Sequence, residues 1–279
     1  RGLAALEEAS PNLVFLAPPD DRSALDRPTL EAAAAWCEAH RAFLIVDPDP
    51  SWSTSADALA GVAALGVASP NAALYFPRLL GPGGGDAGTM PPSGAVAGVY
   101  ARTDAASGVW RAPAGMSAKI GSRVELPLTD ADSGVLNPRA INAIRELSGL
   151  GTVIWGGRTL AGSVTSGSEW RYVAVRRLAI FIEQSIDEGT RWAVFEPNGE
   201  PLWGRIRRTV AEFLRGLLRA GAFPASRPQE AFFVKVDAET TTQADIQAGR
   251  VNVLVGIAPL YPAEFVVIRI QQLAGQPRS

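Results

Sequence analysis

A single histidine, His40, decides which acid–base chemistry the chain could perform. A hydrolase of the Ser-His-Asp kind needs an imidazole as its general base, and the sequence offers no other. His40 comes at the end of an alanine-rich segment predicted to be a helix, where a histidine usually interacts with the helix dipole. We therefore expect a structural role for His40 and no catalytic residue.

The sequence also lacks the groups of residues that typically bind a metal or a cofactor. Cys37 is the one cysteine, so an internal disulfide and a Cys/His zinc site are excluded. Carboxylate pairs such as Asp130 with Asp132, or Glu183 with Glu188, lack a partner histidine and are more typical of a solvated surface. We expect no metal and no cofactor.

One glycine-rich segment matches a nucleotide-binding pattern. Gly83 to Gly88 fit G-x-G-x-x-G, in which the last glycine should open a helix that holds phosphate at its N-terminus. Met90-Pro91-Pro92 follows at once, and Pro92 disfavours helical backbone at Pro91. The segment is therefore predicted to be a surface loop that binds no nucleotide.

Composition favours a soluble globular protein. The 279 residues are 47% hydrophobic and 19% charged, with 26 Lys and Arg against 28 Asp and Glu. This balance excludes both disorder and a strongly basic nucleic-acid-binding protein. The longest uncharged run, residues 58–77, is interrupted by Gly66 and Pro70, so we expect no membrane insertion.

Strands and helices are expected to alternate in the first third of the chain. Apolar strand-like runs at 13–16, 43–46 and 74–76 are separated by helical segments at 29–39 and 55–65. This order predicts a parallel sheet with helices on its faces. Asp47-Pro48-Asp49-Pro50 follows the second strand, at the edge where α/β proteins place many sites.

The second half predicts longer helices and then strands. Asn137-Pro138 is expected to open a helix that ends at Ser148, and a strand is expected at 153–155. Apolar stripes predict amphipathic helices ending at Gly189 and spanning about 202–220. Strands are expected at 232–236, 251–257 and 265–270, and the last of these is apolar on both faces.

Long motifs follow one another between Pro92 and Gln272. They include Gly108–Gly115, Leu136–Arg145, Val153–Leu160, Trp170–Leu178, Phe195–Trp203, Ala231–Lys235 and Pro259–Phe265. In order and spacing they resemble the contractile tail sheath proteins of phages and of phage-like injection systems. Phage tail, bacteriocin, type VI secretion and extracellular injection systems share these motifs.

An upstream segment resembles a protease. Gly88 to Gly98 is similar to the nucleophile segment of subtilisin-type proteases, but the serine expected between Thr89 and Met90 is missing. The sheath family carries a subtilisin-like domain, so the resemblance implies that fold without its nucleophile. The alternative, a subtilisin-like hydrolase, would depend on His40 or Ser93.

The resemblance implies an α/β fold in two parts. Residues 1–105 would form the C-terminal portion of a subtilisin-like α/β domain, and residues 106–279 an α+β sheath domain with an inter-subunit strand at 264–272. The first residue is Arg1, and the sequence is expected to begin partway through a longer protein, after an N-terminal arm.

The implied function is structural. Family sheaths are stacks of hexameric rings around an inner tube, and their contraction drives the tube through a target envelope. The implied partners are further copies of the chain, the inner tube protein, and baseplate and terminator proteins. The protein would assemble in the bacterial cytoplasm as part of a phage tail or a related particle that can be released. A non-contractile baseplate component is a further alternative.

Three groups of residues are the expected contact sites. The inter-subunit strand is Phe265, Val266, Val267, Ile268, Arg269 and Ile270, whose two apolar faces suit strand addition to a neighbouring sheet. The polar stretch Asp237–Arg250 resembles a helix that faces the tube, with Asp245 and Arg250 as contacts. Exchangeable inter-subunit ion pairs are expected from Asp187, Glu188, Arg205, Arg207 and Arg208.

Overall fold

The computed structural model describes residues 2–6, 9–20, 22–81 and 88–264, and the expected strand at 265–270 lies outside them. A six-stranded sheet forms the centre of the body, by which we mean residues 2–172. Its order is β1 (Leu13–Phe15), β2 (Phe43–Val46), β3 (Ala72–Phe76), β7 (Ile141–Leu147), β8 (Gly151–Ile154) and β6 (Lys119–Ile120). The first four strands are parallel, as expected, and β8 and β6 complete the sheet in antiparallel pairing.

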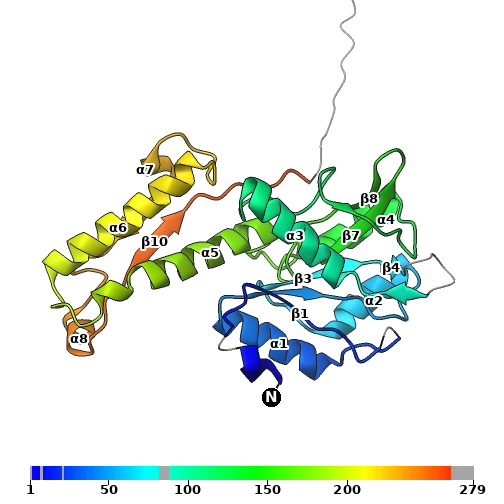
Figure 1. The fold of residues 1–279 in the computed structure, drawn as a ribbon, viewed down its shortest axis with the longest axis horizontal. Helices are drawn as coiled ribbons and strands as arrows, with labels where there is room; N and C mark the ends of the chain where they lie inside the picture. Colours follow the sequence, from blue (N-terminus) through cyan, green and yellow to red (C-terminus); the bar gives the residue numbers. More distant parts are fainter. Residues whose placement is uncertain (1, 7–8, 21, 82–87, 265–279) are drawn as a thin grey trace, which may run out of the picture.

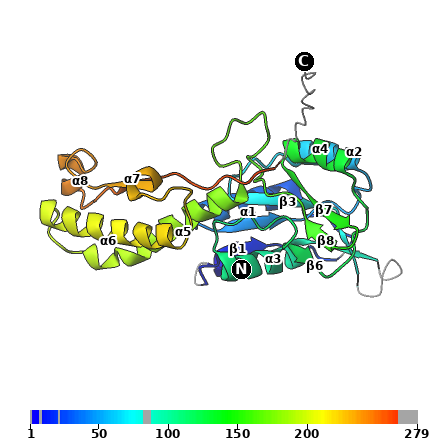
Figure 2. The same cartoon turned by 90° about the horizontal axis from the view of Figure 1, so that it is seen from above.

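Helices cover both faces of this sheet (Figure 1). Side chains of α1 (Arg27–Ala39), α2 (Ser55–Leu65) and α4 (Asp130–Leu136) share one apolar core with alternate strand residues. Side chains of α3 (Ser93–Ser107) and of the first half of α5 (Val173–Gly189) share the other core. Figure 2 shows α2 and α4 on one side of the sheet and α3 on the other. Strands β2 and β3 are buried on both faces, which explains their continuous apolar runs.

A helical lobe extends from the body. We call residues 173–257 the lobe; α5 (Val173–Gly189) leads out of the body and α6 (Glu200–Arg219) returns alongside it (Figure 1). Leu178, Ile182, Ile206, Val210 and Leu214 pack between them in a third core. The stripes expected for these two helices are confirmed. The lobe also contains α7 (Pro228–Ala231), β9 (Phe232–Lys235), α8 (Gln243–Gln247) and β10 (Leu254–Ile257).

The buried Arg177 and the partly buried Arg176 attach α5 to the body. Arg177 forms a two-pronged ion pair with Asp104 of α3, with N–O distances of 2.6 and 2.8 Å. Its guanidinium group lies 4.8 Å from the centre of the Tyr100 ring. Arg176 donates from Nε to Asn71 Oδ1 at 2.7 Å. Both arginines lie near the N-terminal end of α5, so these contacts fix the part of the lobe that adjoins the body.

One expectation is wrong, and the sheet has further features that the sequence did not indicate. The helix expected from Pro138 to Ser148 is wrong, because a 3-10 turn (Asn137–Arg139) is followed there by strand β7. Strands β6, β7 and β8 come after residue 105, so segments from both sides of the expected domain division join one sheet. Short strands β4 (Leu79–Leu80) and β5 (Thr89–Met90) pair beside it, and Gly2–Leu6 and Arg191–Ala193 are 3-10 helices. No helix within the described residues is long and apolar enough to cross a lipid bilayer.

The buried thiol of α1 provides a first test of this packing. Cys37 is fully buried, and burial, with the nearby charge of Glu38, raises the pKa of its thiol to about 12. Because the thiolate is the reactive form, we expect no labelling by a maleimide in the native protein at neutral pH and full labelling in denaturant. Rapid labelling of the native protein, followed by mass spectrometry, would contradict the packing of α1 on the sheet.

Candidate assembly site

The residues required by the hydrolase alternative are not brought together. His40 and Ser93 belong to opposite ends of β2, since His40 precedes that strand and Ser93 contacts Asp47, which follows it. The His40 ring stacks on Trp36 at 4.2 Å, and its Nδ1 lies 2.8 Å from the Trp36 carbonyl oxygen. The described residues therefore contain no Ser-His contact at this edge of the sheet, and His40 serves the end of α1.

Asp47 instead joins β2 to α3. Ser93 donates to its carboxylate from both the backbone nitrogen and Oγ, each at 2.7 Å. Pro92, the residue before α3, has no side chain that can cap the helix. Asp47, which follows β2, supplies the missing acceptor. Burial raises the pKa of Asp47, against the opposing effects of Ser93 and the charge of Arg78.

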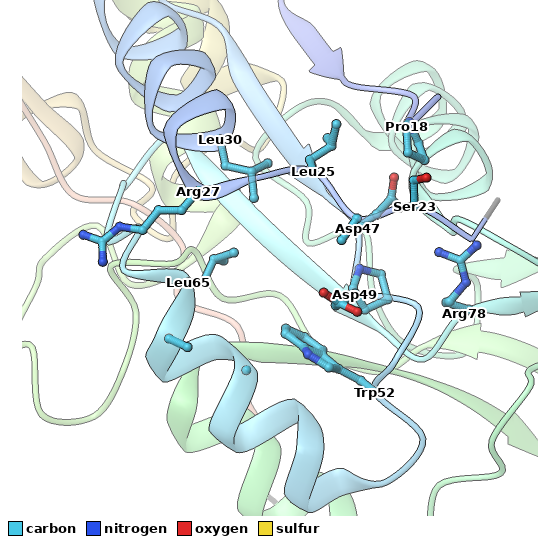
Figure 3. A pocket seen from close by; sticks show the side chains of 14 residues that line it. Pro18, Ser23, Leu25, Arg27, Leu30, Asp47, Asp49, Trp52, Leu65 and Arg78 are labelled. Carbon is cyan, nitrogen blue, oxygen red and sulfur yellow. The ribbon is translucent and has the colours of Figure 1, made fainter. Parts of the chain in front are cut away.

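A hollow of about 250 Å³ opens beside this junction (Figure 3). Asp47, Asp49 and Arg78 line it, together with Trp52 and aliphatic side chains. Its polar groups already have partners within the chain: Asp49 accepts from Ser51, and Arg78 donates to Thr89. The hollow therefore lies over a structural junction of β2, β3 and α3.

Removing the Asp47 carboxylate should destabilise the body. In Asp47→Ala, the N–H and hydroxyl of Ser93 lose their acceptor, and we expect the free energy of unfolding to fall by about 1–3 kcal/mol. Ser93→Ala removes only the hydroxyl bond and should cost less. Chemical denaturation of both variants checks the order; equal stability of Asp47→Ala and wild type would contradict the capping role.

The small sheet of β9 and β10 offers a backbone edge for assembly. The two strands pair antiparallel, with Val255 opposite Val234 and Gly256 opposite Phe233. A Cβ on Gly256 would lie 2.0 Å from the Phe233 ring, so only glycine lets that ring lie across β10. A two-stranded sheet has two edges, and each presents unpaired backbone groups unless something covers it.

Hydrogen bonding identifies the more open edge. Ala258 N donates to Ala231 O, which places Gly256 and Leu254 in bonded pairs with β9 and turns the backbone N–H groups of Val255 and Ile257 outward. On the β9 side, the Val236 carbonyl oxygen already accepts from Arg207 of α6 at 2.8 Å. The outer edge of β10 is therefore the candidate site for strand addition.

The segment that follows β10 is anchored on the body. Residues 258–264, which we call the return segment, run from β10 back to the body (Figure 1). Arg158 donates to Glu264 from Nε to Oε1 at 2.7 Å and from Nη2 to Oε2 at 2.5 Å. Asn137 Nδ2 and Tyr172 Oη donate to the same carboxylate at 3.1 and 3.2 Å. We call these four residues the clasp.

Burial and charge both act on the clasp. The side chains of Arg158 and Glu264 are 4% and 14% exposed. Burial raises the pKa of Glu264, but the hydrogen bonds and charge of Arg158, with Asn137 and Tyr172, outweigh it and hold that pKa below its usual value. The Tyr172 ring also meets Tyr261 edge-on, 6.0 Å between centres. The last described residue is therefore held in the ionised form.

The clasp predicts a pH dependence. Because the pKa of Glu264 is lowered in the folded state, its contribution to stability is present above the ordinary carboxyl pKa and is lost as the pH falls through the lowered value. We expect Glu264→Gln to be less stable than wild type at pH 7, with the difference shrinking below about pH 4. Thermal unfolding at several pH values measures this, and a difference independent of pH would contradict the ion pair.

The expected tube-contact residues contact each other. Asp245 accepts from Thr242 and so caps α8, and Arg250 Nη2 lies 3.2 Å from its Oδ1. Asn198 Nδ2, in the turn between α5 and α6, donates to the Arg250 carbonyl oxygen at 2.9 Å. Both side chains therefore have partners within the lobe, and their contact with a tube stays a prediction.

Most of the charges expected to pair between subunits also have partners within the chain. Asp187 pairs with Arg41 at 3.4 Å, and Arg205 pairs with Glu196 at 3.0 Å. The remaining contacts are Glu188 with Gln184, and Arg207 with Val236 and Glu200. Arg208 is exposed and has no ion pair among the described residues. An inter-subunit role stays a prediction for all five. Arg208 could form such a pair without giving up an ion pair among the described residues.

Two features were missed from the sequence. Glu264 and Arg158 lie within recognised motifs, but 106 residues separate them and no local pattern indicates their pairing. Phe195, also within a motif, is fully exposed and has a φ of +69°, a left-handed conformation that bulky residues avoid. Only the folded chain shows either feature.

Comparison with known proteins identifies the family. A family profile described as "Phage tail sheath C-terminal domain" matches residues 165–272. The chain is similar to the sheath of an extracellular contractile injection system, PVC, in its contracted state: 34% identity, 94% of this chain and 70% of that one, with a TM-score of 0.80. The chain belongs to the contractile tail sheath family. This confirms the resemblance and the α/β class expected from the sequence.

Other members of the tail sheath family agree. The helical sheath of the anti-feeding prophage in its contracted state shares 32% identity over 92% of this chain and 69% of that one, with a TM-score of 0.72. The tail sheath protein of Enterobacteria phage T4 shares 31% identity over 46% of this chain. The chain spans about a fifth of the length of the curated phage sheath proteins of T4 and KVP40. The subtilisin-like detail and the domain division at residue 105 stay predictions.

Proposed function

We propose that this chain belongs to a structural subunit of a contractile sheath, which polymerises as stacked rings around an inner tube and contracts. The observation that carries the proposal is the open edge of β10 beside an anchored return segment, in a chain that belongs to the tail sheath family. An apolar segment starts directly after the anchor. No substrate is turned over in this role.

Strand exchange is the proposed linkage between subunits. Phe265–Ile270 of one copy adds to the outer edge of β10 in another, where the N–H groups of Val255 and Ile257 point outward. Main-chain bonds give affinity, and the side chains set register. At about 1 kcal/mol per hydrogen bond, four or five bonds would contribute on the order of 5 kcal/mol per strand.

The remaining contacts are assigned to outward-facing charges. Arg208 and its neighbours on α6 would meet acidic groups on a second copy, and α8 with Asp245 and Arg250 would face the inner tube. The ion pair of Arg205 with Glu196 is exposed at both side chains, so it could break and reform at low cost during contraction. Baseplate and terminator proteins would bound the polymer, which would assemble in the bacterial cytoplasm and function as part of a tail-like particle.

The proposal is tested by imaging the full-length protein. We expect negative-stain electron microscopy to reveal tubes with a regular helical repeat when the protein is expressed alone or with its tube protein. Dispersed monomers under both conditions would contradict a sheath and favour a non-contractile baseplate component.

A further inference from the structure

The start of the lobe and the end of the return segment meet at the clasp. The lobe begins at Val173, directly after Tyr172, and the return segment ends at Glu264. The hydroxyl of Tyr172 donates to the Glu264 carboxylate, so the point where the chain leaves the body touches the point where it comes back. The segment proposed to join a neighbour starts one residue later. Glu264 of the clasp is therefore the residue directly before that segment.

Hydrogen bonds connect the clasp to the middle of the large sheet. Asn142 of β7 holds the backbone of Arg158 from both sides: Arg158 N donates to Asn142 Oδ1 at 2.7 Å, and Asn142 Nδ2 donates to Arg158 O at 2.8 Å. Asn142 Nδ2 also donates to Leu74 O of β3 at 3.0 Å. Asn142 and Arg158 are buried, at 0% and 3% exposed. A continuous path thus runs from Glu264 to the two central parallel strands.

The backbone connects Glu264 to a smaller sheet than the clasp does. It leads back through residues 258–263 to β10, a four-residue strand at the edge of a two-stranded sheet. Tension applied to the end of β10 would act on its hydrogen bonds to β9. The same strand is the proposed receptor for a neighbour's segment. A subunit pulled through β10 would therefore lose its own receiving edge.

We infer that Arg158 is a positioning residue for the inter-subunit segment: through Glu264 it fixes where that segment leaves the body and passes tension from it into the six-stranded sheet. This inference rests on the proposed sheath function. A two-pronged, charge-assisted pair suits the role because its two bonds fix direction as well as position. Arg158 cannot be replaced by lysine without loss of this geometry. The small sheet of β9 and β10 can then receive a neighbour's strand without bearing the tension from the inter-subunit segment of its own subunit.

The test compares tubes of full-length variants under shear. Glu264→Gln keeps the side chain's shape and removes its charge, and Arg158→Lys keeps the charge and removes the fork. Glu31→Gln is the matched control, because it makes the same change in an exposed ion pair of α1, with Arg27. Tubes are assembled without agitation, sonicated for a fixed time, and measured by electron microscopy. Thermal unfolding of the unassembled protein is recorded in parallel.

We expect tubes of Glu264→Gln and Arg158→Lys to break into pieces shorter than those of wild type by about threefold or more, and Glu31→Gln to match wild type. A folded Glu264→Gln that assembles no tubes also supports the inference. Equal lengths for wild type and both clasp variants would overturn it, and so would failure of both clasp variants to fold, since the clasp would then serve folding alone. Absence of tubes from wild type would overturn the sheath function itself.

Discussion

Ending the chain after Glu264 is expected to abolish tube formation while leaving the fold intact. The described fold is complete at that residue: the three apolar cores, the small sheet and the clasp are all formed by residues up to 264. What the truncation removes is the proposed inter-subunit strand, Phe265–Ile270. Losing four or five backbone bonds at about 1 kcal/mol each would weaken each contact by a factor on the order of a thousand.

A second truncation serves as the control. Ending the chain after Gln272 removes only the residues beyond the expected strand at 264–272 and beyond the matched family region. We expect this protein to assemble like wild type. Both truncated proteins should give the same circular dichroism spectrum and melting temperature as the full-length chain before assembly. Tubes from the protein that ends at Glu264 would contradict strand exchange.

Blocking the receiving edge should have a comparable effect from the other side of the contact. Val255→Pro removes an N–H group that points away from β9, so the small sheet keeps its own bonds and loses a donor for the incoming strand. We expect no tubes from Val255→Pro, and normal tubes from Val255→Thr, which keeps the N–H and a β-branched shape. Electron microscopy compares the two.

A mixing experiment separates the two halves of this contact. Val255→Pro still carries an intact Phe265–Ile270 segment, whereas the protein that ends at Glu264 still carries an intact β10 edge. We expect the two proteins to form mixed dimers in analytical ultracentrifugation, although neither forms tubes alone. Normal tubes from Val255→Pro, or no interaction between the two proteins, would place the linkage at another surface.

Much of the fold could be predicted because it depends on local patterns. Buried parallel strands separated by helices predict an α/β sheet, and the stripes of α5 and α6 fix which faces of these helices are buried. The segment Ile141–Leu147 was misassigned for a physical reason. Its first five residues are buried on both faces, so it lacks the alternation of a half-exposed strand, and Pro138 with Gly149 supplies the boundaries of a helix equally well.

The candidate site was less predictable because its parts are distant in sequence. Arg158 and Glu264 meet only when the lobe has folded and the return segment has come back to the body. Asp47, directly after β2, caps α3 at Ser93, 46 residues later in the sequence. Resemblance to the sheath family indicated that the C-terminal strand matters. It did not indicate which sheet edge could receive that strand, or which residues hold Glu264 directly before it.

A cryo-EM reconstruction of tubes assembled from the full-length protein tests the central claim most directly. The account predicts density for Phe265–Ile270 of one copy running beside Leu254–Ile257 of another copy, bonded to the backbone of Val255 and Ile257. Density in which this segment folds back onto the β10 of its own copy, or lies away from β10 altogether, would contradict the account.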